Sequence, residues 1–89
     1  MAQEYDARKN AKNMEKHGIG FERVTDMDWS KSFTTPDPRR DYGEERFATF
    51  AYLGDRLHCL IWTWRDGVVR PISFRKANTR ERKKYEKEI

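Results

Sequence analysis

The chain has 89 residues and a formal net charge of +4, with 36% hydrophobic, 38% charged and 13% aromatic residues. This length predicts one domain over residues 1–89, and the aromatic content favours a folded core over disorder. The single cysteine excludes an internal disulfide framework and a cysteine-based zinc site. No apolar run approaches the ~20 residues of a membrane span, so we expect a soluble, cytoplasmic protein.

The first predicted elements are a short edge strand over residues 3–6 and a helix over residues 7–18. Asp6 is a suitable N-cap because its carboxylate can accept hydrogen bonds from the free N–H groups of the first turn. Gly18 is a suitable left-handed terminator. Three apolar residues recur at helical spacing along this helix, namely Ala7, Ala11 and Met14.

A second, shorter helix is predicted to start near Gly20, with Phe21, Val24 and Met27 facing the core. Residues 32–35 predict a short strand. The prolines, glycine and charges that follow predict a loop.

Three longer strands are predicted next, and tight turns between them imply antiparallel pairing. The middle one is nearly continuous in apolar residues, as is typical of a central strand. Pro71 cannot donate to a sheet ladder, which predicts a bulge or an edge position in the last strand. The strands cover residues 45–53, 56–64 and 68–75, with turns at Gly54-Asp55 and Asp66-Gly67.

A final helix over residues 78–88, capped by Asn78 or Thr79, completes the order β-α-α-β-β-β-β-α. This order predicts a small α+β domain, with an antiparallel sheet packed against helices. From Arg70 onward the chain has eight basic residues against three acidic ones. Such a concentration of positive charge favours a polyanionic partner such as nucleic acid.

Most signatures of enzyme chemistry are missing from the sequence. There is no Gly-rich phosphate loop and no HExxH pattern. His17 and His58 lie far apart, and with Cys59 they form no convincing metal set, so we expect no metal and no cofactor. His58 and Cys59 are adjacent in a strand and therefore point to opposite faces, Cys59 being the better candidate for the core.

Arginine, lysine and aromatic residues around the strands are the remaining candidates. Trp62 is expected to pack in the core, whereas Trp64, at the strand end, is a candidate platform for stacking an RNA base. A cluster of Arg46, Arg65, Arg75 and Lys76 would stabilise the charge of a phosphorane-like transition state. Because the ribose 2′-OH can be the nucleophile, RNA cleavage needs no nucleophile from the protein. Whether these cations share one face depends on the strand register.

The charged residues of the last predicted helix allow a functional interpretation and a purely structural one. Its basic face, including Arg80 and Lys83, would contact RNA or an acidic partner. Alternatively, Glu81 with Tyr85 and Lys84 with Glu88 are ordinary surface pairs at helical spacing.

Four stretches, taken in order and spacing, resemble the BrnT family of bacterial toxins over nearly the whole chain. The most specific pieces are Lys16-His17-Gly18 before Phe21-Glu22, Gly43-Glu44-Glu45-Arg46-Phe47, and Ile72-Ser73-x-Arg75-Lys76-Ala77 leading to Arg80-Glu81-Arg82. The stretches are EYDARKNAKNMEKHGIGFE, DPRRDYGEERF, WTWRDG and RPISFRKANTRERKKYE. The sequence departs from the family pattern at Trp64 and Pro71.

The resemblance implies a ribonuclease toxin of a type II toxin–antitoxin pair, with a RelE-like fold, that stops growth by metal-independent endonucleolytic RNA cleavage. It also implies a BrnA-like antitoxin with a ribbon-helix-helix domain. Carried over residue by residue, it assigns catalysis to Arg46, Arg65, Arg75 and Lys76, with His17 as a candidate proton shuttle. Two alternatives remain: a non-catalytic basic module that binds nucleic acid or the ribosome, and a gyrase-poisoning relative within the same toxin fold.

Overall fold

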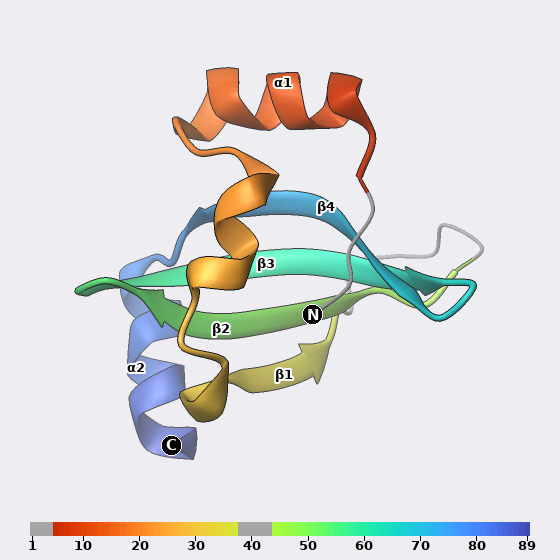
Figure 1. The fold of residues 1–89 in the computed structure, drawn as a ribbon. Coiled ribbons are helices and arrows are strands. Elements are labelled where there is room, and N and C mark those ends of the chain that lie inside the picture. The colour runs from red at the N-terminus through yellow and green to blue at the C-terminus, as the bar shows by residue number, and fades with distance from the viewer. Residues whose placement is uncertain (1–4, 38–43) are drawn as a thin grey trace.

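The structure of the protein, a computed structural model, describes residues 5–37 and 44–89. An antiparallel sheet of four strands has the order β1-β2-β3-β4, so each strand pairs with its neighbour in sequence (Figure 1). The elements are α1 Ala7–His17, the 3₁₀ helices η1 Phe21–Asp26 and η2 Trp29–Lys31, strands β1 Phe33–Pro36, β2 Phe47–Leu53, β3 Arg56–Arg65 and β4 Val68–Lys76, and α2 Thr79–Glu88. The predicted small α+β class is confirmed.

Local chemistry sets the ends of α1 as the sequence predicts. The Asp6 carboxylate accepts hydrogen bonds from the backbone N–H groups of Arg8 and Lys9, at 2.7 and 3.4 Å. Gly18 adopts the left-handed conformation, with φ at 73°. The edge strand predicted before this helix lies partly outside the described residues, and Tyr5 and Asp6 belong to no strand.

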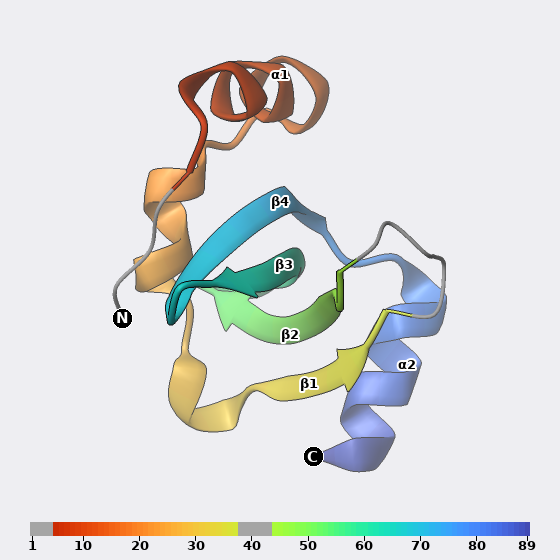
Figure 2. The same ribbon diagram turned by 90° about the vertical axis from the view of Figure 1, so that its right-hand side faces the viewer.

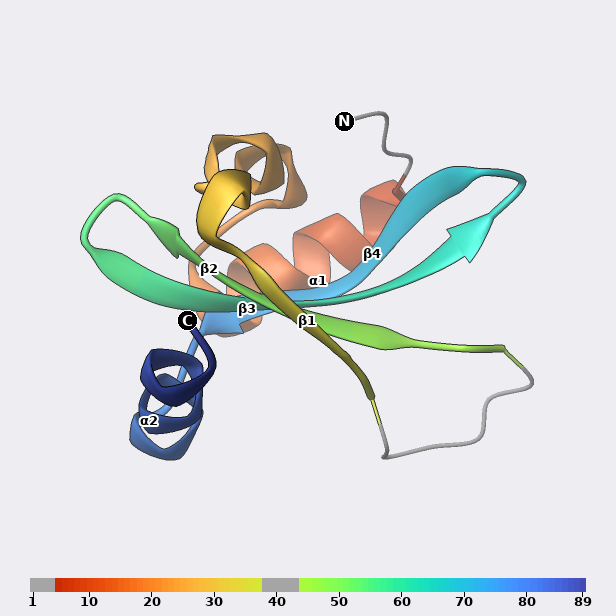
Figure 3. The same ribbon diagram turned by 90° about the horizontal axis from the view of Figure 1, so that it is seen from below.

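The sheet separates two apolar cores. The side carrying η1, which we call the η1 face, buries Leu60, Trp62 and Phe74 against Phe21 and Val24. The opposite side, the α2 face, buries Phe50, Cys59 and Ile61 against Tyr85. Figures 2 and 3 show η1 and α2 on opposite sides of the sheet. Because both faces are covered, His58 and Cys59 are both buried, although they point in opposite directions.

Pro71 lies in an edge strand and next to a β-bulge, which are the two settings that suit a residue without a backbone N–H. Strand β4 forms an edge of the sheet, and the register jumps there from Ile61↔Ser73 to Trp62↔Pro71. Ile72 is therefore the extra residue of a β-bulge. The bulge breaks simple alternation, so Ser73 and Arg75 lie on the α2 face while Pro71 lies on the η1 face.

Helix α1 lies along the free edge of β4 (Figures 1 and 2). Its apolar stripe is not its buried side, since Met14 is 46% exposed. The buried residue is Asn13, whose side chain hydrogen-bonds the backbone N–H and C=O of Phe74. A polar side chain thus replaces the missing neighbouring strand.

Candidate functional site

A cavity of about 270 Å³ lies between α2 and the α2 face of the sheet. Its floor is apolar, whereas its rim carries several charged side chains. The floor includes Phe33, Ala48, Phe50 and Ile61, and the rim includes Asp37, Arg75, Arg80, Glu81 and Lys84. An apolar floor beneath cationic groups suits a nucleobase attached to its phosphate.

Arg75 is the most firmly held of these cations. Its two terminal nitrogens donate to the two carboxylate oxygens of Glu81, each at 2.8 Å. The arginine and glutamate side chains are only 26% and 21% exposed. The Glu81 hydrogen bonds raise the pKa of Arg75, so the guanidinium stays charged throughout the physiological range.

Glu81 also belongs to the cap of α2. Its carboxylate accepts from the backbone N–H of Asn78 at 2.9 Å, while the Asn78 side chain accepts from the Glu81 backbone N–H at 2.8 Å. This reciprocal capping box fixes the start of α2 and places the carboxylate at the strand end. Glu81 is therefore no ordinary surface partner of Tyr85, which is itself buried. The Asn-x-x-Glu spacing was the available sequence signal for this role.

Lys76 does not join Arg75. Adjacent strand residues alternate between faces, and Lys76 pairs with His58 whereas Arg75 pairs with Cys59. The Lys76 side chain is exposed on the η1 face of the sheet. The two residues therefore cannot form one cluster on the same side.

Arg46 and Arg65 form a separate pair at the other end of the sheet. Glu44 lies between them, at 3.4 Å from Arg46 and 3.5 Å from Arg65. From Cys59, the partner of Arg75, strand β3 runs roughly 20 Å to Arg65 at the rise of an extended strand. The single cluster of four cations expected from sequence is therefore divided into three places.

His17, at the end of α1, lies on the side of β4 that carries Ser73. Burial lowers its pKa from 6.5, and the charges of Lys16 and Arg75 lower it further. The imidazole is therefore neutral at pH 7 and can accept a proton.

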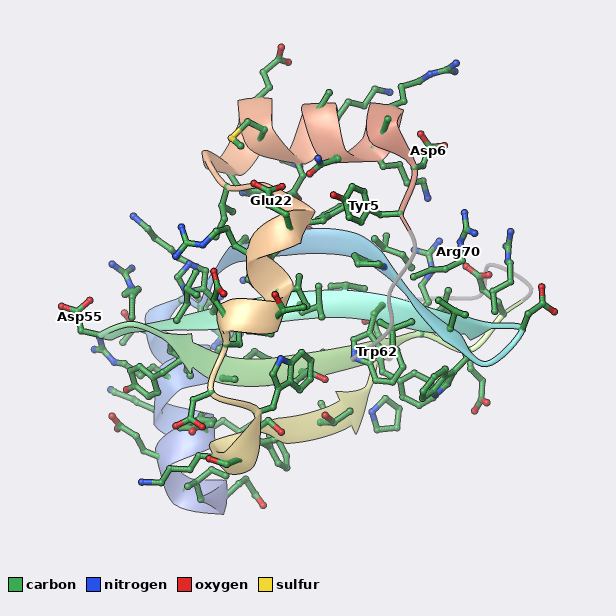
Figure 4. All side chains as sticks on the ribbon, in the orientation of Figure 1. Tyr5, Asp6, Glu22, Asp55, Trp62 and Arg70 are labelled. Carbon is green, nitrogen blue, oxygen red and sulfur yellow. The ribbon has the colours of Figure 1, made fainter. Side chains whose placement is uncertain are left out.

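The remaining predicted RNA contacts are dispersed. Trp64 is 54% exposed and meets Trp62 edge-on, with ring centroids 5.3 Å apart. Trp62, labelled in Figure 4, is buried, as expected. Its indole N–H donates to the Thr49 hydroxyl at 2.8 Å. Arg80 lines the cavity, whereas Lys83 is exposed on α2 outside it.

Over residues 5–37 and 44–89, no group of three His, Cys, Asp or Glu residues is placed to hold a metal ion. Within the same ranges, no helix has the length and apolar character needed to cross a membrane.

The comparison with known proteins gives one family. A search of curated proteins finds no match. The model of the family described as "Ribonuclease toxin, BrnT, of type II toxin-antitoxin system" matches residues 5–81. This range includes α1, the whole sheet and the Arg75–Glu81 pair. The chain belongs to the BrnT family of ribonuclease toxins of type II toxin–antitoxin systems.

Proposed function

We propose that the protein is a metal-independent endoribonuclease of RelE-like type, with Arg75 at the centre of the catalytic site. The 2′-oxygen of a ribose attacks the adjacent phosphorus, and the bond from phosphorus to the 5′-oxygen breaks. The products are a 2′,3′-cyclic phosphate and a 5′-hydroxyl. The proton of the 2′-OH passes to a base, and the departing 5′-oxygen takes up a proton.

The observation that carries this proposal is the position of Arg75 at the rim of the apolar cavity. Its side chain is 26% exposed, and a bidentate carboxylate fixes its plane. A planar guanidinium presents paired donors to the oxygens of a phosphate. In such a poorly solvated position, its charge stabilises the phosphorane-like transition state more than it would in water.

His17 is the proposed general base. Its lowered pKa keeps the ring neutral at pH 7, as a group must be to accept the 2′-OH proton. After that transfer, the imidazolium can return the proton to the 5′-oxygen.

The other cations are proposed to bind RNA outside the reacting phosphate. Arg46 and Arg65 lie beyond the reach of the Arg75 phosphate and would contact a flanking one. Arg80 and Lys83 would contact RNA along α2. Trp64 would stack a base beyond the Arg46–Arg65 end, and Lys76 would meet RNA only on the η1 face.

The partner proposed for this toxin is a BrnA-like antitoxin with a ribbon-helix-helix domain, and the compartment is the cytoplasm. The family description, which names a toxin–antitoxin system, supports the first point. Uncontrolled cleavage of RNA, free or on the ribosome, would inhibit translation and growth.

The test compares wild type with Arg75→Ala and Arg75→Lys, measuring growth after induction and RNA integrity with the purified proteins. Both variants should lose cleavage by a factor of about a hundred or more, because lysine lacks the paired donors. Arg56→Ala, which removes an exposed cation from β3, is the matched control and should cleave like wild type. Circular dichroism establishes that each variant is folded.

The result that contradicts the proposal is a wild-type protein that binds RNA with a steep salt dependence but does not cut it. In that case the protein is the non-catalytic binding module. Cleavage by folded Arg75→Ala at the wild-type rate would remove Arg75 from the mechanism while leaving the ribonuclease activity in place.

A further inference from the structure

A second cavity, of about 380 Å³, lies between α1 and β4. Four cationic or titratable side chains of α1 line it, together with Ile72 and Ser73 of β4. The α1 residues are Lys9, Lys12, Lys16 and His17, with Asn13 between them. Within residues 5–37 and 44–89, no acidic residue lines this cavity, so its lysines are not balanced by a described carboxylate there.

Lys9, Lys12 and Lys16, which we call the lysine row, have regular positions along the helix. Lys9, Lys12 and Lys16 recur at spacings of three and four residues, which places them on one side of α1. From Lys9 to Lys16 the helix rises roughly 10 Å. Among residues 5–37 and 44–89, none of the three forms an ion pair.

Fixed contacts aim this side of α1 at β4. Asn13 hydrogen-bonds both backbone groups of Phe74, and its amide also donates to the Ile19 carbonyl at 2.9 Å. Asn10, one turn earlier, accepts from the backbone N–H of Phe21 at 2.8 Å. These contacts hold the side of α1 that carries the lysines beside the strand edge.

The second cavity adjoins the first across the edge of β4. Ser73 lines the α1 cavity, and Arg75, two residues on and on the same face of the strand, lines the α2 cavity. His17 lines the α1 cavity together with Ser73. Figure 2 shows α1 along the β4 edge of the sheet and α2 against one face of the sheet. A chain that leaves Arg75 in this direction would meet the lysines.

We propose that Lys9, Lys12 and Lys16 bind the phosphodiester backbone of the RNA strand that flanks the phosphate held by Arg75. This inference rests on RNA being the substrate, as in the proposed function. Lysine is depleted in the cores of protein–protein interfaces, and Ile72 is the one apolar residue among the described residues of the lining. Phosphates, in contrast, are neutralised by lysines without apolar contact, so the row fits a nucleic acid better than a protein.

The test uses a short 2′-O-methyl RNA oligonucleotide, which has no free 2′-OH and cannot be cleaved. Fluorescence anisotropy gives its affinity for wild type and for Lys9→Gln/Lys12→Gln over a range of salt concentrations. Both lysines are exposed, and Lys9 takes part in the Asp6 cap only through its backbone N–H, so the double variant should fold normally. Arg23→Gln/Arg56→Gln, which removes the same charge from exposed residues, is the control.

The double lysine variant should bind about tenfold more weakly, and its slope of log affinity against log salt should shrink by about 1.4. Each phosphate of a single strand contributes roughly 0.7 to that slope. The control should keep a slope close to that of wild type. Equal slopes for wild type and the lysine variant, or an equal loss in the control, would overturn the proposal.

Two further arms separate this inference from the proposed function. A failure of wild type to cleave ordinary RNA, with the lysine slope reduced, removes the enzymatic proposal and keeps the lysine site. Loss of affinity for a polyglutamate peptide alone, with the RNA slope unchanged, assigns the row to an acidic protein partner and overturns the RNA site.

Discussion

Asn13 of α1 hydrogen-bonds both backbone groups of Phe74 in β4, at 2.8 Å to the carbonyl and 2.9 Å from the N–H. One asparagine side chain therefore completes the edge of the sheet where a fifth strand could otherwise pair. Both contacts are buried. The same residue orients α1, and with it His17 and the lysine row.

Asn13→Ala should be strongly destabilising. It leaves the N–H and C=O of Phe74 without their partner in a buried position, at a cost of about 2–4 kcal/mol. Urea unfolding followed by tryptophan fluorescence measures the change. Met14→Ala, at the neighbouring exposed position, should cost less than about 0.5 kcal/mol. Similar losses for both variants would mean that the edge contact adds nothing specific.

Tyr85 should contribute most of the free energy that holds α2 against the sheet. Its ring is buried and packs edge-on against the ring of Tyr52, with the ring centroids 5.8 Å apart. Its hydroxyl donates to the Lys31 carbonyl. Tyr85→Phe should cost about 1 kcal/mol for the lost hydrogen bond. Tyr85→Ala should cost about 3–5 kcal/mol, because it also leaves a cavity. Equal stability of the Phe and Ala variants in urea unfolding would show that packing of the ring is not the main contribution of Tyr85 to stability.

Glu81→Gln should increase affinity for RNA. The substitution removes a negative charge that competes with phosphate for Arg75, while the amide oxygen can still accept from Asn78. An increase of at least about fivefold is expected, because two unit charges about 4 Å apart interact by about 1 kcal/mol even in water and this pair is only partly exposed. Anisotropy with an uncleavable oligonucleotide measures it. Glu88→Gln on the same helix is the control and should change affinity less than twofold, roughly, since Glu88 is exposed at the helix end.

Stability should rise with pH as the histidines titrate. Burial lowers the pKa of His17 and of His58 from 6.5, and nearby positive charges lower both further. Between each lowered pKa and about 6.5, the unfolded chain binds more protons than the folded one. The free energy of unfolding therefore increases as pH rises through that window and levels off above it.

Urea unfolding at several pH values from about 5 to 8 tests this dependence. His58→Leu should flatten part of the curve, because the imidazole is buried against the Phe74 ring. A curve that falls with pH over this range would show that the histidines are charged in the folded protein.

Much of the fold follows from the sequence alone because the interactions concerned are local. Asp6 and Asn78 cap helices through hydrogen bonds to residues two or three positions away. Asp66 and Gly67, both at positive φ, close the β3–β4 hairpin as their chemistry predicts. The cores on both faces follow from apolar periodicity, and the family follows from motifs spread along the chain.

Only the tertiary structure decided how the cations group. Strand register and the bulge at Ile72 place Arg75 on the α2 face, and alternation sends Lys76 to the other. The length of β3 separates Arg75 from Arg65, so charges close in a sequence motif become distant in space. The same is true of Asn13: its polarity suggests a surface residue, but the unpaired edge of β4 buries it. A sequence specifies each residue's chemistry and its near neighbours, whereas the partner across a sheet edge depends on packing between elements far apart in the chain.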